Sequence, residues 1–139
     1  MSLFRVFDVA GSAMSAQSVR LNTTASNLAN ANSVSSSANE TYKARYPVFQ
    51  AQLDQANAAQ NEAVGVNVAG IVESDAPLVN EFNPNHPLAD ENGYVYRPNV
   101  NVMEEMANMI SASRSYQTNV QIAESAKQML NKTLTLGQG

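Results

Sequence analysis

Apolar residues recur every seven positions at both ends of this 139-residue chain. A period of seven places side chains along one line of an α-helix. The repeat therefore predicts two helices, over 3–31 and 102–134, separated by a middle section in which the period changes. The members of the repeat are Phe7, Met14, Leu21 and Leu28 in the first helix, and Val102, Met109, Tyr116, Ala123 and Leu130 in the second.

Two helices of similar length, each with a narrow apolar seam, pack most simply as an antiparallel coiled coil. At 1.5 Å per residue the helices would be about 43 Å and about 50 Å long. Such pairing would bring Phe7 close to 123–130, and Leu28 close to 106–109. We predict a mainly α fold, with long N- and C-terminal helices and a small β-hairpin-type insert. The predicted seam residues are Phe7, Met14, Leu21, Leu28, Val102, Met106, Met109, Tyr116, Val120, Ala123 and Leu130.

The second helix carries clear end signals. Asn101 can cap its amino terminus, where Glu104 and Glu105 would face free N–H groups and the positive end of the helix dipole. Gly137 follows the last apolar residue, a position at which glycine favours termination. Adjacent helix positions point in different directions, so we interpret the two glutamates as capping residues rather than as a catalytic pair.

Between the helices the apolar period becomes two. Valines at 64, 66, 68 and 72 predict a short strand pair or one bent strand, and Asn92–Tyr96 predicts a hairpin turn entering another strand. The Ala- and Gln-rich stretch 50–63 could be a loose helix or a disordered loop. The predicted units are a coiled-coil domain (1–32 and 99–139), a linker and variable loop (33–63), and a β insert (64–98).

The composition predicts a thin core. Leu, Ile, Val and Phe form about 22% of the chain, just above the level near which chains stay disordered. Ser, Thr, Asn and Gly within 3–31 reduce helix propensity by about 6 kcal/mol relative to alanine, which is comparable to the net stability of a typical domain. Such a chain would be marginal alone, so we expect association of many copies to stabilise it. A flexible amino terminus is the simpler alternative.

Several function classes are excluded by composition. The chain has no cysteine, one histidine and a net charge of −4, which argues against thiolate and multi-histidine metal sites and against nucleic-acid binding. Arg5 and Asp8 interrupt the amino terminus, so no cleaved signal peptide is expected. No apolar run reaches the roughly 20 residues of a membrane span. We expect no catalytic residue, cofactor, metal or small-molecule substrate.

Two stretches of the chain carry recognisable motifs. The segment AMSAQSVRLNTTASNLANANS, which includes Asn27, Leu28, Ala29, Asn30 and Asn32, resembles the motif shared by the rod and hook axial proteins of the bacterial flagellum. The segment HPLADENGYVYRPNVN, from His86 to Asn101, is similar to the C-type subunit of the flagellar proximal rod. The approach to His86 departs from the usual pattern, because Phe82-Asn83-Pro84-Asn85 stands where an aromatic-acid-Pro-Gly sequence is common.

The resemblance implies a structural subunit of the periplasm-spanning rod in the basal body of the flagellum. It implies export through the flagellar type III apparatus without a cleaved signal, and a hetero-oligomeric helical assembly. The implied partners are other rod subunits, the rod adaptor and the MS ring, with the P ring as a further candidate. The residues expected to face neighbouring subunits are Asn27, Asn30, Asn32, His86, Tyr94 and Asn99.

A neutral polar stripe runs along the second helix, made of Asn108, Ser111, Ser115, Thr118, Ser125 and Gln128. It is either an ordinary solvated face or the wall of a water-filled passage. The family places its C-terminal helix against the export channel, so the resemblance favours the channel-facing interpretation.

Two other functions stay open at the level of sequence. A stand-alone antiparallel coiled-coil adaptor or chaperone would have the same seam but would fold as a stable monomer or dimer. A hydrolase would depend on His86, the single histidine, beside Asp90 and Glu91. A histidine between prolines is more typical of a fixed turn whose imidazole bonds to the backbone.

Overall fold

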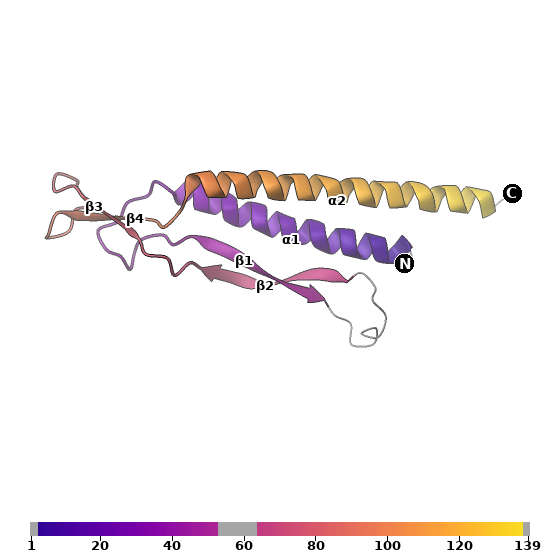
Figure 1. Cartoon of the computed structure of the whole chain (residues 1–139), viewed down its shortest axis with the longest axis horizontal. Helices are drawn as coiled ribbons and strands as arrows, with labels where there is room; N and C mark the ends of the chain where they lie inside the picture. Colours follow the sequence, from indigo (N-terminus) through magenta and orange to yellow (C-terminus); the bar gives the residue numbers. More distant parts are fainter. Residues whose placement is uncertain (1–2, 53–63, 138–139) are drawn as a thin grey trace.

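The chain forms an elongated rod in which two long antiparallel helices lie side by side (Figure 1). The computed structural model describes residues 3–52 and 64–137. Both termini lie toward one end of the rod, and a small hairpin projects at the other (Figure 1). The elements in chain order are α1 (Leu3–Asn30), β1 (Arg45–Gln52), β2 (Gly65–Glu73), β3 (Val79–Phe82), β4 (Tyr94–Arg97) and α2 (Val102–Gly137). The predicted mainly α fold with a small β insert is confirmed.

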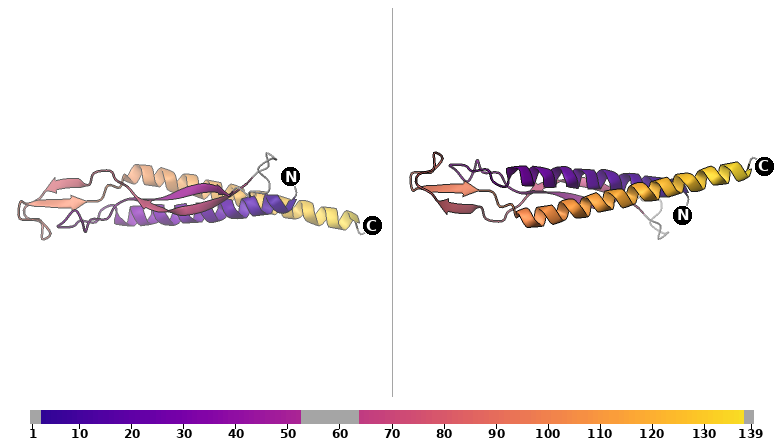
Figure 2. Two further views of the ribbon diagram at one scale, coloured as in Figure 1. Left: turned by 90° about the horizontal axis from the view of Figure 1, so that it is seen from below. Right: turned by 90° about the horizontal axis from the view of Figure 1, so that it is seen from above.

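The ends of the helices follow the predicted signals closely. Asn101 caps α2, because its side-chain oxygen accepts hydrogen bonds from the backbone N–H groups of Met103 at 3.2 Å and Glu104 at 3.4 Å. The last helical residue is Gly137, whereas the sequence predicted an end at Leu134. The longer α2 extends past the amino terminus of α1 (Figure 1), and the two helices cross at a shallow angle (Figure 2).

Strands β1 and β2 form an antiparallel hairpin that packs along α1, on the side away from α2 (Figure 1). The pairing runs from Arg45 opposite Glu73 to Gln52 opposite Gly65, with a bulge between Val48 and Phe49. Of the four valines expected in a strand pair or one bent strand, Val66, Val68 and Val72 belong to β2, and Val64 lies just before it. The sequence did not predict β1. The final residues of this strand fall within 50–63, the stretch expected to be a loose helix or a disordered loop. Positions 53–63 of that stretch lie outside the described residues.

Strands β3 and β4 form the second hairpin, at the far end of the rod (Figure 1). The predicted turn is closed by Gly93, which has a φ of 82°, a conformation that glycine adopts without steric cost. The rings of Phe82 and Tyr94 meet edge to face, with centroids 5.2 Å apart. Backbone hydrogen bonds between Ser35 and Tyr96 tie this hairpin to the segment that follows α1.

The core is built almost entirely of alanine. Among the described residues, the buried apolar side chains are Ala10, Ala16, Ala31, Ala44, Val95, Ala112 and Ala126. Small side chains let helices approach closely but bury little apolar area, and burial contributes only about 25 cal/mol per Å². The thin core expected from composition is therefore present, and most large apolar side chains lie at the surface.

The helix seam is rotated from the predicted line. On α1 the repeat residues from Phe7 to Leu28 are only partly buried. On α2, four residues predicted for the seam are exposed, by 38% to 49%: Val102, Met106, Tyr116 and Val120. The buried residues of α2 are instead Glu105, Ala112 and Ala126. Large apolar residues defined the predicted line, whereas close approach of the two helices requires small side chains and accommodates one buried polar contact.

Candidate functional site

Asn27, in the last turn of α1, is the centre of a buried polar network. Its side chain is fully buried, with 0% exposure. The amide nitrogen donates to the backbone oxygen of Arg45 at 2.9 Å and to Oε2 of Glu105 at 3.1 Å. The amide oxygen accepts from the backbone N–H of Arg45 at 2.9 Å and from the Tyr42 hydroxyl at 2.8 Å. One side chain therefore links α1, α2, β1 and the segment before β1.

The contact between Asn27 and Arg45 imitates a strand pairing. The carboxamide meets both backbone groups of Arg45, the first residue of β1, as a neighbouring peptide would in a sheet. Each amide hydrogen and each lone pair of the carbonyl oxygen then has one partner. Aspartate in this position would lack the two donors, and alanine would leave the strand end unpaired.

Glu105 is the largest of the fully buried side chains, at 1% exposure. It lies in the first turn of α2, where the positive end of the helix dipole favours negative charge. Desolvation, together with the adjacent Glu105 carboxylate, raises the pKa of the Tyr46 hydroxyl to about 12. The phenol therefore stays protonated at neutral pH beside the carboxylate.

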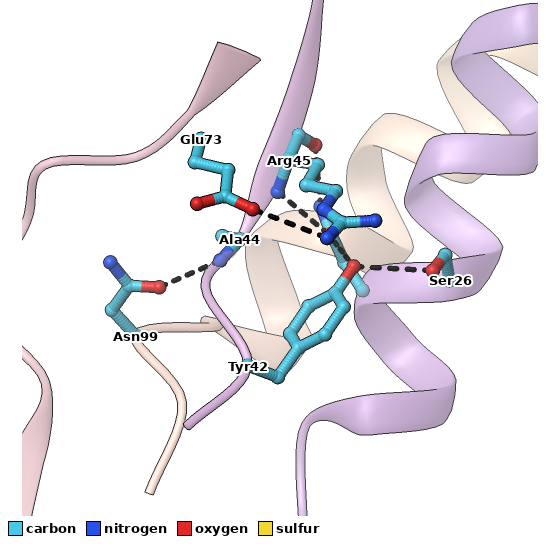
Figure 3. A network of polar contacts seen from close by, with 7 residues as sticks. Ser26, Tyr42, Ala44, Arg45, Glu73 and Asn99 are labelled. Atoms are coloured by element: carbon cyan, nitrogen blue, oxygen red, sulfur yellow. Dashed lines mark hydrogen bonds and ion pairs between the residues drawn. The ribbon is translucent and has the colours of Figure 1, made fainter. Parts of the chain in front are cut away.

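Asn99 forms a second tie, just before α2. Its side-chain oxygen accepts from the backbone N–H of Ala44 at 2.8 Å, and its nitrogen donates to the carbonyls of Ser74 at 3.3 Å and Ala76 at 2.8 Å. Figure 3 shows Asn99 reaching Ala44 beside the start of β1. The start of α2, the start of β1 and the segment after β2 are therefore held together as one unit.

The charged contacts around this network are peripheral. Arg45 lies 3.2 Å from Glu73 across the hairpin, and both side chains are about half exposed. The Arg45 guanidinium also stacks over the Tyr42 ring at 5.5 Å, and the Tyr42 hydroxyl lies 3.2 Å from that of Ser26 (Figure 3). Exposed ion pairs contribute little stability, so the buried amide contacts determine the geometry.

Most residues expected to face neighbouring subunits have bonds within the chain. The prediction that Asn27 faces a neighbouring subunit is wrong, because its side chain is fully buried within the chain. Asn30 donates to the carbonyl of Ser26 at 2.8 Å, and Asn32 accepts from Arg97 at 3.2 Å. Asn99 has the three bonds described above. Bonds within the chain do not exclude contacts with a neighbour, so the interface role of Asn30, Asn32 and Asn99 stays a prediction.

His86 is also bonded within the chain, whereas Tyr94 is exposed. His86 Nδ1 accepts a hydrogen bond from the backbone N–H of Leu88 at 3.1 Å, which is the fixed-turn arrangement expected for a histidine between prolines. Tyr94 is 42% exposed at the tip hairpin and is available to a neighbour. The described residues contain no group of three or more His, Cys, Asp or Glu side chains that could hold a metal ion.

The neutral stripe on α2 is only partly open. Asn108 points to α1, where its oxygen accepts from Arg20 at 2.8 Å, and Ser115 is partly buried. The remaining members are exposed: Ser111, Thr118, Ser125 and Gln128. Thr118 and Ser125 line an open groove against the first turns of α1. The outward-facing stripe is therefore narrower than the sequence predicted.

A second exposed surface on α2 is strongly apolar. We call it the apolar flank; its members are Val102, Met103, Met106, Ile110, Tyr116 and Val120, with exposures from 38% to 76%. Spacings of three and four residues keep its first members on one side of the helix. Four of these residues, Val102, Met106, Tyr116 and Val120, were predicted to lie in the intramolecular seam. Contiguous apolar surface of this kind marks interaction sites in soluble proteins.

No described helix is long and apolar enough to cross a membrane.

Residues 7–35 match the family model for flagella basal body rod proteins, and residues 91–136 match the C-terminal model of flagellar basal body rod FlgEFG proteins. These two regions contain Asn27 and Glu105, the two ends of the buried contact.

Whole-chain relatives have the same description. The flagellar basal-body rod protein FlgC of Salmonella typhimurium is 52% identical over an alignment of 139 residues that covers 99% of this chain and all of that protein. The Yersinia enterocolitica FlgC is 53% identical over 138 residues with the same coverage, and that of Buchnera aphidicola from Acyrthosiphon pisum is 40% identical. Identity of this extent over the full length shows that the chain belongs to the FlgC family of flagellar basal-body rod proteins.

Proposed function

We propose that this structural rod subunit polymerises with other rod proteins into a tubular drive shaft that transmits torque and encloses an export channel. The observation that carries the proposal is the inverted distribution of apolar residues, with alanine inside and large side chains on the apolar flank. Repeated contact between unlike surfaces that does not close into a ring builds a helical tube. The flank would then be buried between subunits.

The finer features of this proposal come from the family resemblance. The subunit would lie in the periplasmic part of the basal body, after export by the flagellar type III apparatus without a cleaved signal. Its partners would be other rod subunits, the rod adaptor, the MS ring and the P ring. The exposed part of the neutral stripe, from Ser111 to Gln128, is the candidate channel-facing surface. The stand-alone adaptor or chaperone is not supported, since the full-length relatives are rod proteins.

The apolar flank provides a direct test. Met103 and Ile110 lie seven residues apart and are 76% and 54% exposed. Changing both to glutamine removes apolar area that a neighbour would cover. Losing the burial of two such side chains would cost about 2–4 kcal/mol per contact, or about 30- to 1,000-fold in affinity. The double variant should then fail to restore swimming to a strain that lacks the native gene.

The control is a pair with the same spacing, one position further along α2 and therefore about 100° round the helix. Glu104 and Ser111 are also exposed and seven residues apart, and changing both to glutamine should leave swimming intact. Far-ultraviolet circular dichroism of the purified chains should be alike, because neither pair is buried in the subunit. Normal swimming by the Met103→Gln, Ile110→Gln variant would show that this surface is not an assembly contact.

A further inference from the structure

The loop between β3 and β4 contains the dipeptide Asn92–Gly93, at the far end of the rod. Asn92 is exposed to solvent. In an Asn-Gly pair the peptide nitrogen of the glycine can attack the asparagine side chain, because glycine has no Cβ to hinder the approach. The dipeptide is therefore a candidate site of deamidation, a covalent modification that converts asparagine to an acid.

The reaction needs only hydroxide and water as co-reactants. The Gly93 nitrogen gives up its proton to hydroxide and attacks Cγ of Asn92. The bond from Cγ to the amide nitrogen breaks, ammonia leaves, and a cyclic succinimide forms. Water then opens the ring at either carbonyl, which leaves aspartate or isoaspartate at position 92. Overall one water is consumed and one ammonia is released, and nothing is oxidised or reduced.

The folded turn holds the reacting atoms apart. The backbone N–H of Gly93 donates to the carbonyl of Asp90 at 3.0 Å, and the N–H of Asp90 donates to the carbonyl of Tyr94 at 2.8 Å. With Gly93 at a φ of 82°, this is a type I turn followed by a left-handed residue, in which ψ of Asn92 is near 0°. Ring closure requires Cβ of Asn92 to eclipse the Gly93 nitrogen, which is a rotation of roughly 120° from that ψ. The turn must therefore open before Asn92 can react.

Asp90 holds this turn closed. Its carboxylate oxygen Oδ1 accepts from the backbone N–H groups of Asn92 at 2.9 Å and Tyr94 at 2.8 Å, while its carbonyl accepts from that of Gly93. Three successive N–H groups therefore donate to one residue, and the two that reach the carboxylate are charge-assisted and so stronger than neutral bonds. Phe82 and Pro84 fill the space over Gly93, where an added Cβ would lie 3.0 Å and 3.1 Å from them.

We propose that Asn92–Gly93 is a deamidation site whose reactivity is controlled by the fold, and that Asp90 is the residue that protects it. Because the reaction proceeds from the open turn, its rate follows the population of that state. Isoaspartate would add one carbon atom to the backbone, so the N–H groups of residues 92–94 could no longer all reach Asp90. Deamidation would then make the opening of the tip hairpin permanent.

The rate is measured on the purified full-length chain at mildly alkaline pH. Tandem mass spectrometry of proteolytic peptides assigns the gain in mass to residue 92, and chromatography separates aspartate from isoaspartate. The folded chain is kept in sulfate, which favours compact states, and the chain in guanidinium chloride at the same pH gives the rate of the open state. Asn92 should react at least about tenfold more slowly in the folded chain, because several hydrogen bonds must break first.

Variants of the turn test the role of Asp90. Asp90→Ala removes the acceptor of two backbone N–H groups and should raise the rate in sulfate by about tenfold. Asp90→Asn keeps an oxygen in place of Oδ1 and should recover most of the protection. The matched control is Glu91→Gln, which removes one negative charge from the neighbouring exposed position and should leave the rate within about threefold of the native one.

Other results would overturn the proposal. Equal rates in sulfate and in guanidinium chloride would mean that the fold does not protect Asn92. An unchanged rate in Asp90→Ala would mean that Asp90 does not hold the turn closed, and an equal rise in Glu91→Gln would assign the effect to lost charge. If Asp90→Ala loses its helical circular dichroism, Phe82→Ala decides: it empties the space over Gly93 without changing the turn, and it should raise the rate at least about threefold.

Discussion

Overpacking the alanine seam should separate the two helices. Ala112 is 0% exposed on the face of α2 that packs on α1, so leucine at this position would place three additional carbon atoms into filled space. Overpacking of this kind costs about 1–3 kcal/mol, whereas the change in helix propensity from alanine to leucine is only about 0.2 kcal/mol. We therefore expect Ala112→Leu to lower the melting temperature by about 4–12 °C.

The matched control is Ala107→Leu, at an exposed position of the same helix. It carries the same propensity change without the steric one. Thermal unfolding of both full-length variants is followed by far-ultraviolet circular dichroism in sulfate, at one fixed protein concentration because association would shift the midpoint. Equal melting temperatures for Ala112→Leu and Ala107→Leu would refute the close alanine packing of α1 against α2.

Two further changes test local features. Gly93→Ala should destabilise the β3–β4 hairpin by about 1–2 kcal/mol. The reason is that φ of residue 93 is 82° and that a Cβ there would lie 3.0 Å from the Phe82 ring and 3.1 Å from Pro84. Amide hydrogen exchange in β3 and β4 measures the loss of hairpin stability. Tyr46→Phe should flatten the alkaline loss of stability. The folded-state pKa of about 12 lies above the ordinary tyrosine pKa of 10.0, so the contribution of the Tyr46 phenol to stability is complete below about pH 10 and is lost toward pH 12. Urea midpoints of the two chains across this interval should converge as pH rises.

The existence and limits of the helices were predictable because their signals are local. A repeat of period seven, an asparagine cap and a terminal glycine all lie within a few residues of the feature they specify. The resemblance to rod proteins was likewise carried by contiguous motifs, and the full-length relatives confirm it. The turn at Gly93 followed from the Asn-Gly pair.

The face of each helix and the strand β1 were not predictable in the same way. The sequence cannot show that Glu105 is buried opposite Asn27, because residues far apart in the chain determine this contact, and charged residues are normally exposed. Strand β1 contains Pro47 and glutamines, which weaken its strand pattern. Its order depends on pairing with β2 and on the Asn27 carboxamide, both of which are non-local.

Stability and specificity are divided between different residues in this subunit. The largest fully buried side chains are Glu105, Val95 and Asn27, and two of these three are polar. Replacing a buried polar pair by well-packed apolar side chains often leaves a protein equally stable or more stable, so the contact is better explained by the geometry it imposes than by the energy it contributes. The large apolar side chains that could have strengthened the interior lie instead on the apolar flank. In the proposed rod assembly, such a chain would specify its shape from within and draw its stability from the neighbours that cover the flank.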